Sequence, residues 1–474
     1  MKFLEENIRR DIQANITYFN NVINVNKNFD LVYRVVEFGG RKACFYFVDG
    51  FLKDEILQKL LQYFQSIKQE DMPSTPHEMS KLCMPYGEVD ILCGWEEILK
   101  NLLSGVTIIF IDGYKECIAL DCRTYPMRGV EEPEKDKVLR GSKDGFVETI
   151  ICNTALIRRR IRSTDLRMEV LNAGKASKTD IVLCYMDTRV DQEFLKKIKD
   201  RIKDIKVDAL TMNQESLAEC LFTSKWYNPF PKFKYTERPD VAAAQILEGN
   251  IIILVDNSPS AMILPISILD AVEEADDYYF PPITGTYLRI SRFLIFLMTY
   301  LLTPTFLLFM QNQQWIPESF QFVIVKDTMN IPLLWQFLIL ELAIDGLKLA
   351  AINTPNMLST PLSVMAALVL GEFSVKSGWF NSEIMLYMSF VAIANYTHQS
   401  YELGYAIKFF RMLNLVLTAM FNVWGYILGI SLFLLAIIRN KMVSGQSYLY
   451  PILPFSFKKL GKALIRKRLP DSRE

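Results

Sequence analysis

An otherwise apolar segment, Pro332 to Ala350, carries three charged residues: Glu341, Asp345 and Lys348. Their spacings of four and three residues place them on one face of an α-helix. The segment is close in length to the roughly 20 residues with which a helix crosses a bilayer. Because ionised side chains are costly at that depth, they face a bundle interior or a water-filled path. The segment therefore predicts a membrane protein with polar groups inside its helical part.

Two arrangements account for this charged face. In a ring of identical subunits, Glu341 and Asp345 repeat around the axis and form carboxylate rings that concentrate monovalent cations. Lys348 then lies at the cytoplasmic mouth, where its long stem lets the amine reach water. All three are pore-lining candidates in this arrangement. Alternatively, Asp345 pairs with Lys348 at i,i+3, and Glu341 hydrogen-bonds to a neighbouring helix.

The rest of the chain divides by composition. Up to residue 288, charged and apolar stretches alternate as in a soluble α/β protein, whereas apolar runs dominate 289–440. A charged, glycine-punctuated linker starts at residue 129, so the first part is expected to form two subdomains, 1–128 and 129–288. We therefore expect an α+β cytoplasmic head of two mixed α/β subdomains, followed by an α-helical transmembrane domain at 289–440 and a basic tail at 441–474.

Glycine turns punctuate the head. Two pairs of strand-like runs flank such turns and predict hairpins, 31–37 with 43–48 and 106–111 with 117–120. The stretch 105–112 also resembles 249–256, and both combine a strand and a turn after a helix. Either an internal duplication or independent β-hairpin chemistry accounts for this similarity.

The two ends of the chain indicate its orientation in a membrane. Residues 1–10 contain acidic residues and no apolar core, so no signal peptide is expected. Residues 439–474 hold nine Lys or Arg against two Asp or Glu, so the tail is expected in the cytoplasm. With both termini inside, the number of crossings is even. We favour four crossings, with 357–371 re-entrant, at about 293–310, 332–350, 381–398 and 412–438. The alternative is six, in which 357–371 crosses and the last stretch breaks into two spans.

The sequence argues against an enzyme. With only two histidines, a His-rich metal site is not expected, and the eight cysteines form no CxxC pair and are expected to be buried free thiols. No Walker pattern occurs, and Gly39-Gly40 lacks the rest of a dinucleotide fingerprint. The basic tail is expected to be a membrane anchor rather than a nucleic-acid arm. We expect no catalytic residue, no metal and no cofactor.

Four stretches carry a resemblance to a known family: 129–148, 153–161, 238–244 and 448–454. They resemble the GerA-type family of spore germinant-receptor A subunits, and the resemblance covers roughly residues 130–460. It implies a protein of the spore inner membrane in an endospore-forming Firmicute, acting in germination. It further implies a ring-like homo-oligomer, a pentamer, which is proposed to conduct cations across the lipid bilayer.

The linker departs from the pattern of the family's receptors, which carry two prolines and a Gly-Pro-Arg after the linker glutamate. Here the corresponding stretches read Glu132-Pro-Glu134 and Gly141-Ser-Lys143. The resemblance therefore implies a branch that amplifies the response alongside germinant receptors and a small membrane partner protein, rather than one that senses the germinant.

The linker and the basic run after it supply candidates for subunit contact or signal coupling: Glu132, Arg140, Gly141 and Arg158. From composition alone, the linker is a solvated charged loop, and the resemblance favours a coupling element at its Arg140-Gly141 end. The run of arginines that starts at Arg158 either binds anionic lipid or acidic neighbours, or it is a solvated helix face paired with the linker.

The function expected from these observations is an oligomeric cation-conducting channel subunit that amplifies the germinant-receptor response. The alternative is a non-conducting membrane scaffold that clusters germinant receptors or the dipicolinate-release machinery. A secondary transporter would require inverted repeats and paired broken helices, and only one broken segment, at Pro361, is evident.

Overall fold

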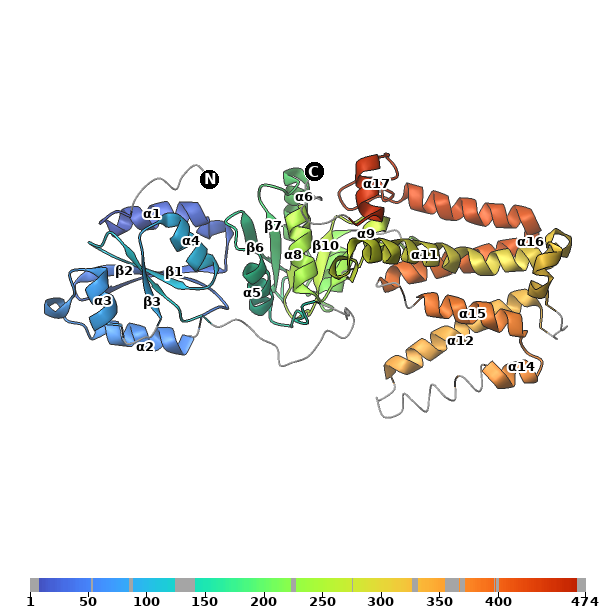
Figure 1. Ribbon diagram of the computed structural model, residues 1–474, viewed down its shortest axis with the longest axis horizontal. Helices are drawn as coiled ribbons and strands as arrows, with labels where there is room; N and C mark the ends of the chain where they lie inside the picture. Colours follow the sequence, from blue (N-terminus) through green and yellow to red (C-terminus); the bar gives the residue numbers. More distant parts are fainter. Residues whose placement is uncertain are drawn as a thin grey trace. The chain divides into compact units, whose positions relative to one another are not determined.

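The computed structural model describes residues 8–52, 54–84, 88–123, 141–222, 227–274, 276–325, 331–353, 366, 371–395, 397 and 400–466. The chain divides into two compact units. The head comprises residues 1–224 with 233–265, and the helical unit comprises 225–232 with 266–474. Figure 1 shows the strands in the first unit and the long helices in the second.

The first subdomain of the head is a five-stranded antiparallel sheet between two helical layers. Its strands pair in the order β1-β2-β4-β5-β3. The strands are β1 (Leu31–Phe38), β2 (Arg41–Val48), β3 (Val89–Leu92), β4 (Thr107–Ile111) and β5 (Cys117–Leu120). The helices are α1 (Ile12–Ile23), α2 (Asp54–Gln65), α3 (Pro76–Leu82) and α4 (Trp95–Leu103), with 3-10 turns η1 (Val25–Lys27) and η2 (Gln69–Asp71).

Side-chain alternation along the strands builds one core on each face of this sheet. Cys44 and Tyr46 of β2 belong to the core that also contains residues of α1 and α4. Ala43 and Phe45 belong to the opposite core, with residues of α2 and α3. Both predicted hairpins, β1 with β2 and β4 with β5, are confirmed.

The second subdomain repeats this architecture. Its sheet order is β6-β7-β9-β10-β8, and again every pair is antiparallel. The strands are β6 (Leu166–Ala173), β7 (Thr179–Met186), β8 (Lys234–Thr236), β9 (Ile251–Val255) and β10 (Ala261–Leu264). The helices are α5 (Ile150–Arg160), α6 (Gln192–Lys203), α7 (Gln214–Leu221) and α8 (Pro239–Glu248). Both subdomains thus run helix, two strands, two helices, strand, helix, two strands.

Equivalent side-chain contacts support an internal duplication. The side chain of Asn15 in α1 forms two hydrogen bonds with the main chain of Arg9, accepting from its N–H at 2.9 Å and donating to its carbonyl at 2.6 Å. The side chain of Asn153 in α5 forms the same two hydrogen bonds with the main chain of Val147, at 2.8 and 2.6 Å. A second equivalent pair joins each helix start to the turn after a central strand, Ile12 N–H to Asp112 and Ile150 N–H to Asp256. Of the two explanations for the sequence similarity, these contacts favour duplication over independent hairpins.

The helical unit begins with two short helices and continues with long apolar ones. Its helices are α9 (Ile268–Val272), α10 (Asp276–Tyr279), α11 (Pro282–Gln311), α12 (Leu333–Asn353), α14 (Ser374–Lys376), α15 (Ser382–Asn395), α16 (Tyr401–Arg439) and α17 (Phe457–Leu464), with 3-10 turns η3 (Gln313–Trp315) and η4 (Glu318–Val323). Among the described residues, α11 and α16 are long and apolar enough to cross a membrane by length and composition, and α15 is a shorter apolar helix.

The last apolar stretch is a helical hairpin. Asn422 has non-helical backbone angles, φ 49° and ψ −127°. Gly425 packs so closely on the carbonyl of Leu417 that a Cβ there would lie 1.8 Å from its oxygen. Residues eight apart in a straight helix are about 12 Å apart, so the chain reverses at Asn422. The stretch 412–438 therefore forms two helical arms, one on each side of Asn422, and the number of membrane crossings stays a prediction.

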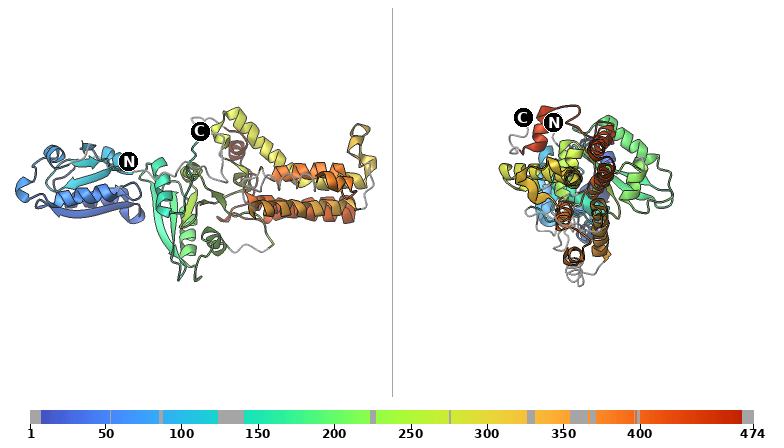
Figure 2. Two further views of the ribbon diagram at one scale, coloured as in Figure 1. Left: turned by 90° about the horizontal axis from the view of Figure 1, so that it is seen from below. Right: turned by 90° about the vertical axis from the view of Figure 1, so that its right-hand side faces the viewer.

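Helix directions follow from contacts between helix ends. Gln336, near the start of α12, donates to the Asn381 side chain at 2.9 Å, and Asn381 immediately precedes α15. These two helices contact each other and therefore run parallel. Asn353, the last residue of α12, is 17 residues beyond Gln336, or about 25 Å along the axis. Asn353 and the start of α15 consequently lie at opposite ends of the bundle, whose helices Figure 2 shows running side by side.

Candidate functional site: charge clusters of the helical unit

Glu341 of α12 lies between helices of its own chain. Arg411 lies in the first arm of α16, the part before Asn422. It donates to Glu341 Oε1 through Nε at 2.8 Å and also through NH2. The Glu341 side chain is 2% exposed and that of Arg411 is 0% exposed. Arg411 NH1 also donates to the carbonyl of Thr299 in α11, at 3.0 Å. This guanidinium therefore joins three helices.

A second cation of α16 joins both acids. Lys408 Nζ donates to the main-chain carbonyl of Glu341 at 3.0 Å and lies 3.3 Å from its Oε2. It also forms an ion pair with Asp345 Oδ2. The other oxygen of Asp345, Oδ1, is buried and has no hydrogen-bond partner among the described residues. Asp345 is the more open acid, with 27% of its side chain exposed.

The cluster is close to electrically neutral, since Lys408 and Arg411 offset Glu341 and Asp345. A buried charge is tolerated only where a partner compensates its lost hydration. The sequence did suggest an intramembrane ion pair as one alternative, with Lys348 as the cation. Asp345 pairs with Lys408, and Lys348 Nζ lies 5.8 Å from the ring centroid of Tyr405. The pore-lining role of Glu341, Asp345 and Lys348 concerns an assembly of several chains and stays a prediction.

Lys408 and Arg411 were missed by the sequence reasoning. They lie three residues apart and therefore on one face of the first α16 arm, just as Glu341 and Asp345 share a face of α12. A matching pair of acids and pair of cations in two apolar helices was the available signal.

Further polar side chains continue from this cluster through the bundle. Tyr300 of α11 donates to the Gly429 carbonyl at 3.1 Å, and Asn414 donates to the Tyr300 hydroxyl at 3.3 Å. Thr303 is fully buried, and its hydroxyl has no partner among the described residues. At the hairpin tip, Asn312 and Asn422 exchange side-chain hydrogen bonds, at 2.6 and 3.2 Å.

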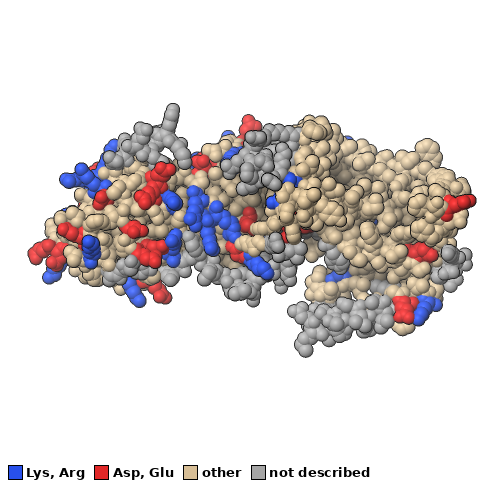
Figure 3. All heavy atoms as spheres, in the orientation of Figure 1, with Lys and Arg blue, Asp and Glu red and all other residues tan. Residues whose placement is uncertain are grey.

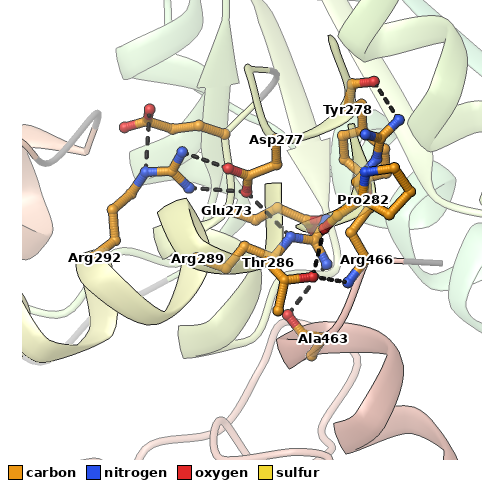
Figure 4. A network of polar contacts seen from close by, with 10 residues as sticks. Glu273, Asp277, Tyr278, Pro282, Thr286, Arg289, Arg292, Ala463 and Arg466 are labelled. Carbon is orange, nitrogen blue, oxygen red and sulfur yellow. Dashed lines mark hydrogen bonds and ion pairs between the residues drawn. The ribbon is translucent and has the colours of Figure 1, made fainter. Parts of the chain in front are cut away.

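A second charge cluster marks the start of α11 (Figure 4). Asp277 of α10 is fully buried and accepts from Arg292 NH1 at 2.8 Å and from Arg289 Nε at 3.1 Å. Glu273 pairs with Arg289, and Glu274 pairs with Arg292 at 3.3 Å. Two arginines and three acids are thus packed together just before the apolar part of α11.

The end of the described chain is attached to this cluster. The carbonyl of Ala463 in α17 accepts from Arg289 NH1 at 3.2 Å. Arg466 donates through its main-chain N–H to Thr286 Oγ1 at 3.1 Å and through NH2 to the Tyr278 carbonyl at 2.6 Å. Figure 4 shows these contacts on one side of Arg289. Helix α17 is therefore held against the first turns of α11.

Segment 227–232 and the motif at 448–454 meet elsewhere in the helical unit. Lys232 Nζ donates to the carbonyl of Lys441 at 2.6 Å and to the side chain of Asn440. Burial lowers the pKa of Lys232 to about 8. Tyr448 is fully buried, burial raises its pKa, and its ring lies 5.9 Å from Lys232 Nζ. The motif at 448–454 thus begins with a core residue.

The predicted coupling residues separate in the structure. Glu132 and Arg140 lie outside the described residues, and Gly141 is exposed with φ +116°. Arg158 is buried: its Nε lies 2.8 Å from Asp30 Oδ2 and its NH2 3.2 Å from Asp30 Oδ1. This guanidinium joins the two subdomains of the head. The coupling roles of all four residues stay predictions.

Among the described residues, no group of three or more His, Cys, Asp or Glu side chains is arranged to hold a metal ion. The described part of the chain contains all eight cysteines as free thiols. Burial raises the pKa of Cys44 to about 12, so this thiol stays protonated and unreactive near neutral pH.

A family model and several known proteins match most of this chain. A family model described as Bacillus/Clostridium GerA spore germination protein matches residues 18–474. Stage V sporulation protein AF of Bacillus subtilis (strain 168) is 34% identical over 473 residues, which cover 99% of this chain and 95% of the relative. Spore germination protein KA of the same organism is 26% identical and covers 93% of this chain and 82% of the relative.

One solved structure is also similar. It is the N-terminal domain of the A subunit of the Bacillus megaterium spore germinant receptor GerK3, with 24% identity and a TM-score of 0.41. The match covers 54% of this chain and 96% of that domain.

Proposed function

Because this chain belongs to the GerA family of spore germination proteins, we propose that it is a multi-pass subunit of a cation-conducting oligomer in the spore inner membrane. In this proposal, it amplifies the response of germinant receptors. Its family comprises receptor subunits and sporulation proteins rather than known enzymes, which fits a role without a catalytic step. Receptors and a small membrane protein are its proposed partners.

The surface of the helical unit supports a membrane location. Large apolar side chains are exposed along α11, α12 and α16, including Leu342 at 74%, Ile352 at 80% and Trp424 at 78%. Figure 3 shows few charged residues on the visible face of the helical unit and many on the head. Water disfavours such a surface, whereas lipid accommodates it.

Helix directions favour six crossings. The α12 and α15 helices run parallel, which fits the six-crossing alternative; its crossing at 357–371 lies outside the described residues apart from 366 and 371. With that proposed crossing, α11, α12, α15 and the two halves of α16 account for six passes, an even number as expected with both termini on the cytoplasmic side. The four-pass topology treats 412–438 as one span, and the reversal at Asn422 argues against it.

Asp345 is the observation that carries the conduction proposal. Glu341 is neutralised by Arg411, but Asp345 keeps a buried oxygen without a partner among the described residues and a side chain that is 27% exposed. A partly exposed acid with one oxygen paired to Lys408 and the other without a partner among the described residues can attract a cation and release it again. We assign Asp345, with Lys348 one turn away, to the aqueous path, and Glu341 to its support.

Conductance of the reconstituted oligomer tests this assignment. Asp345→Asn should lower potassium conductance in planar bilayers without changing assembly, because it removes the acid at the path. The matched control is Glu372→Gln, which neutralises an acid of the same unit whose side chain is 52% exposed. Wild-type conductance in an assembled Asp345→Asn oligomer would refute the assignment of Asp345 to the path. An assembled wild-type oligomer that passes no potassium, alone or with receptors, would refute the conduction proposal.

A non-conducting scaffold is the second candidate. The observation in its favour is the pairing of Glu341 with Arg411 and Lys408 inside one protomer, which removes the charge that a carboxylate ring requires. A scaffold restores germination kinetics in spores that lack the protein yet passes no ions, alone or with receptors. Measuring both quantities on the same preparation separates the two functions.

A further inference from the structure

The described end of the chain exposes apolar side chains on and around a basic helix. Five large apolar residues between 452 and 465 are exposed, at 38, 46, 67, 80 and 54%: Ile452, Leu453, Phe455, Phe457 and Ile465. Isolated exposed apolar residues are ordinary, but a group within 14 residues indicates an interaction surface.

The sequence of α17 is that of an amphipathic helix. Lys462 follows Lys458 by four residues and Lys459 by three, so these three positions share one side of the helix, whereas positions 460 and 464, both Leu, share another. No Asp or Glu occurs between residues 439 and 470. A short helix with this pattern is typical of segments that lie in the plane of a membrane surface.

Contacts with α11 set the depth of this segment. Ala463 accepts from Arg289, and Arg466 donates to Thr286, so α17 lies beside the first turns of α11. The apolar run of α11 begins at Phe293, seven residues after Thr286 and about 10 Å further along the helix. The α17 helix therefore lies at headgroup depth if α11 crosses the bilayer.

Two features of the first turns of α11, beside α17, indicate that the exposed segment contacts lipid rather than another protein. Ile283 and Tyr287 are 81% and 68% exposed there, so the apolar surface of α11 continues onto the level of α17. Arg289 and Arg292 are both paired with the buried carboxylate of Asp277, whereas the lysines of α17 belong to a segment without acids. Anionic headgroups complement those lysines, and the adjoining acyl boundary takes up the aromatic side chains.

We propose that residues 452–466 form an in-plane docking segment for the anionic leaflet that surrounds the helical unit. Phe455 and Phe457 enter the boundary between headgroups and acyl chains, and the lysines of α17 bind lipid phosphates. Docking also steadies the cluster around Asp277, because α17 and Arg466 are bonded to α11. This inference rests on the proposed membrane location of α11.

Hydrogen–deuterium exchange of the full-length protein in nanodiscs tests the proposal. Backbone amides of 457–464 should exchange more slowly in discs that contain phosphatidylglycerol than in pure phosphatidylcholine discs. A lysine near an anionic surface strengthens binding about fivefold, so three set an upper limit on the order of 100-fold. We expect a slowing of tenfold or more. Glycerol phosphate at millimolar concentration should not reproduce it, because the site requires a membrane surface.

The variant Lys458→Gln/Lys459→Gln/Lys462→Gln should lose the difference between the two lipids. Its matched control, Lys196→Gln/Lys197→Gln/Lys203→Gln, removes the same charge from exposed positions of α6 and should keep it. The proposal is overturned if the amides of 457–464 exchange equally fast in both lipids. It is also overturned if the α17 and α6 variants lose the difference between the two lipids equally. If α11 and α16 remain protected in the discs, such a result leaves the membrane location intact. If they exchange freely, the proposed function fails as well.

Discussion

The Glu341–Arg411 pair makes a quantitative test of the bundle possible. Among the described residues, Arg411→Met leaves the Glu341 carboxylate, 2% exposed, with only the longer ion pair to Lys408 at 3.3 Å. Removing one partner of a buried ion pair costs about 3–5 kcal/mol. That corresponds to roughly 10²- to 10⁴-fold in the folding equilibrium. Glu341→Leu should cost a similar amount, because it leaves the fully buried guanidinium without its carboxylate.

The double variant Glu341→Leu/Arg411→Met should be far more stable than the two single costs predict. Replacing a buried pair with apolar side chains is often neutral, or stabilising by about 1–4 kcal/mol. The double-mutant cycle should therefore yield a coupling free energy of several kcal/mol. Unfolding by sodium dodecyl sulfate in mixed micelles, followed by helical circular dichroism, measures all four free energies.

The exposed pair Glu372–Lys376 is the control for this cycle. Its side chains are 52% and 68% exposed, and such pairs contribute about 0–1 kcal/mol. Additive costs at Glu341 and Arg411, or single costs below 1 kcal/mol, would show that the pair is not sealed between the helices. In that case, Glu341 would return to the aqueous path as an acid of the pore.

Three further outcomes can be measured on the same chain. The free energy of unfolding should rise from about pH 8 toward pH 10.5. Lys232 in the folded protein loses its proton near pH 8, whereas the unfolded lysine keeps its proton to about pH 10.4. Lys232→Met should remove this rise when chemical denaturation is measured across that pH range. Gly425→Ala should lower the thermal midpoint strongly, because its Cβ would overlap a main-chain oxygen. Gly346→Ala, whose Cβ would have nothing within 4 Å, should instead stabilise α12 by up to about 1 kcal/mol. Equal changes of the thermal midpoint in the two variants would contradict the hairpin. Arg158→Met should cost about 3–5 kcal/mol and speed amide exchange where the two head subdomains meet, and unchanged exchange at Asp30 would contradict the buried contact.

Local patterns predicted the head well. Gly39 and Gly40 both have positive φ, +57° and +69°, which a tight hairpin turn requires, so the hairpin could be predicted from neighbouring residues alone. The repeated stretches at 105–112 and 249–256 also pointed to the two similar subdomains. Residues of a hairpin meet within a few positions of each other, so the sequence reports their contact directly.

Long-range pairing could not be predicted in the same way. Arg158 read as part of an exposed basic run, yet it is buried against Asp30, 128 residues away. Likewise, the sequence left open whether 412–438 is one span or two, because glycines 425 and 429 in an apolar stretch are equally compatible with a straight helix that packs on a neighbour. Both outcomes depend on which surfaces meet after the elements form.

By itself, the sequence determined that Glu341 and Asp345 share one face of an apolar helix and that this face cannot lie in lipid unpaired, because helical periodicity and the cost of burying charge are local properties. The tertiary structure decided what meets that face. It brings Lys408 and Arg411 against the two acids by folding α16 back at Asn422, leaves Asp345 as the more open acid, and seals Glu341 within the protomer. The physical reason is that an ion pair between two helices forms only when the helices pack against each other. The spacing of charges within one helix does not specify which helix it packs against.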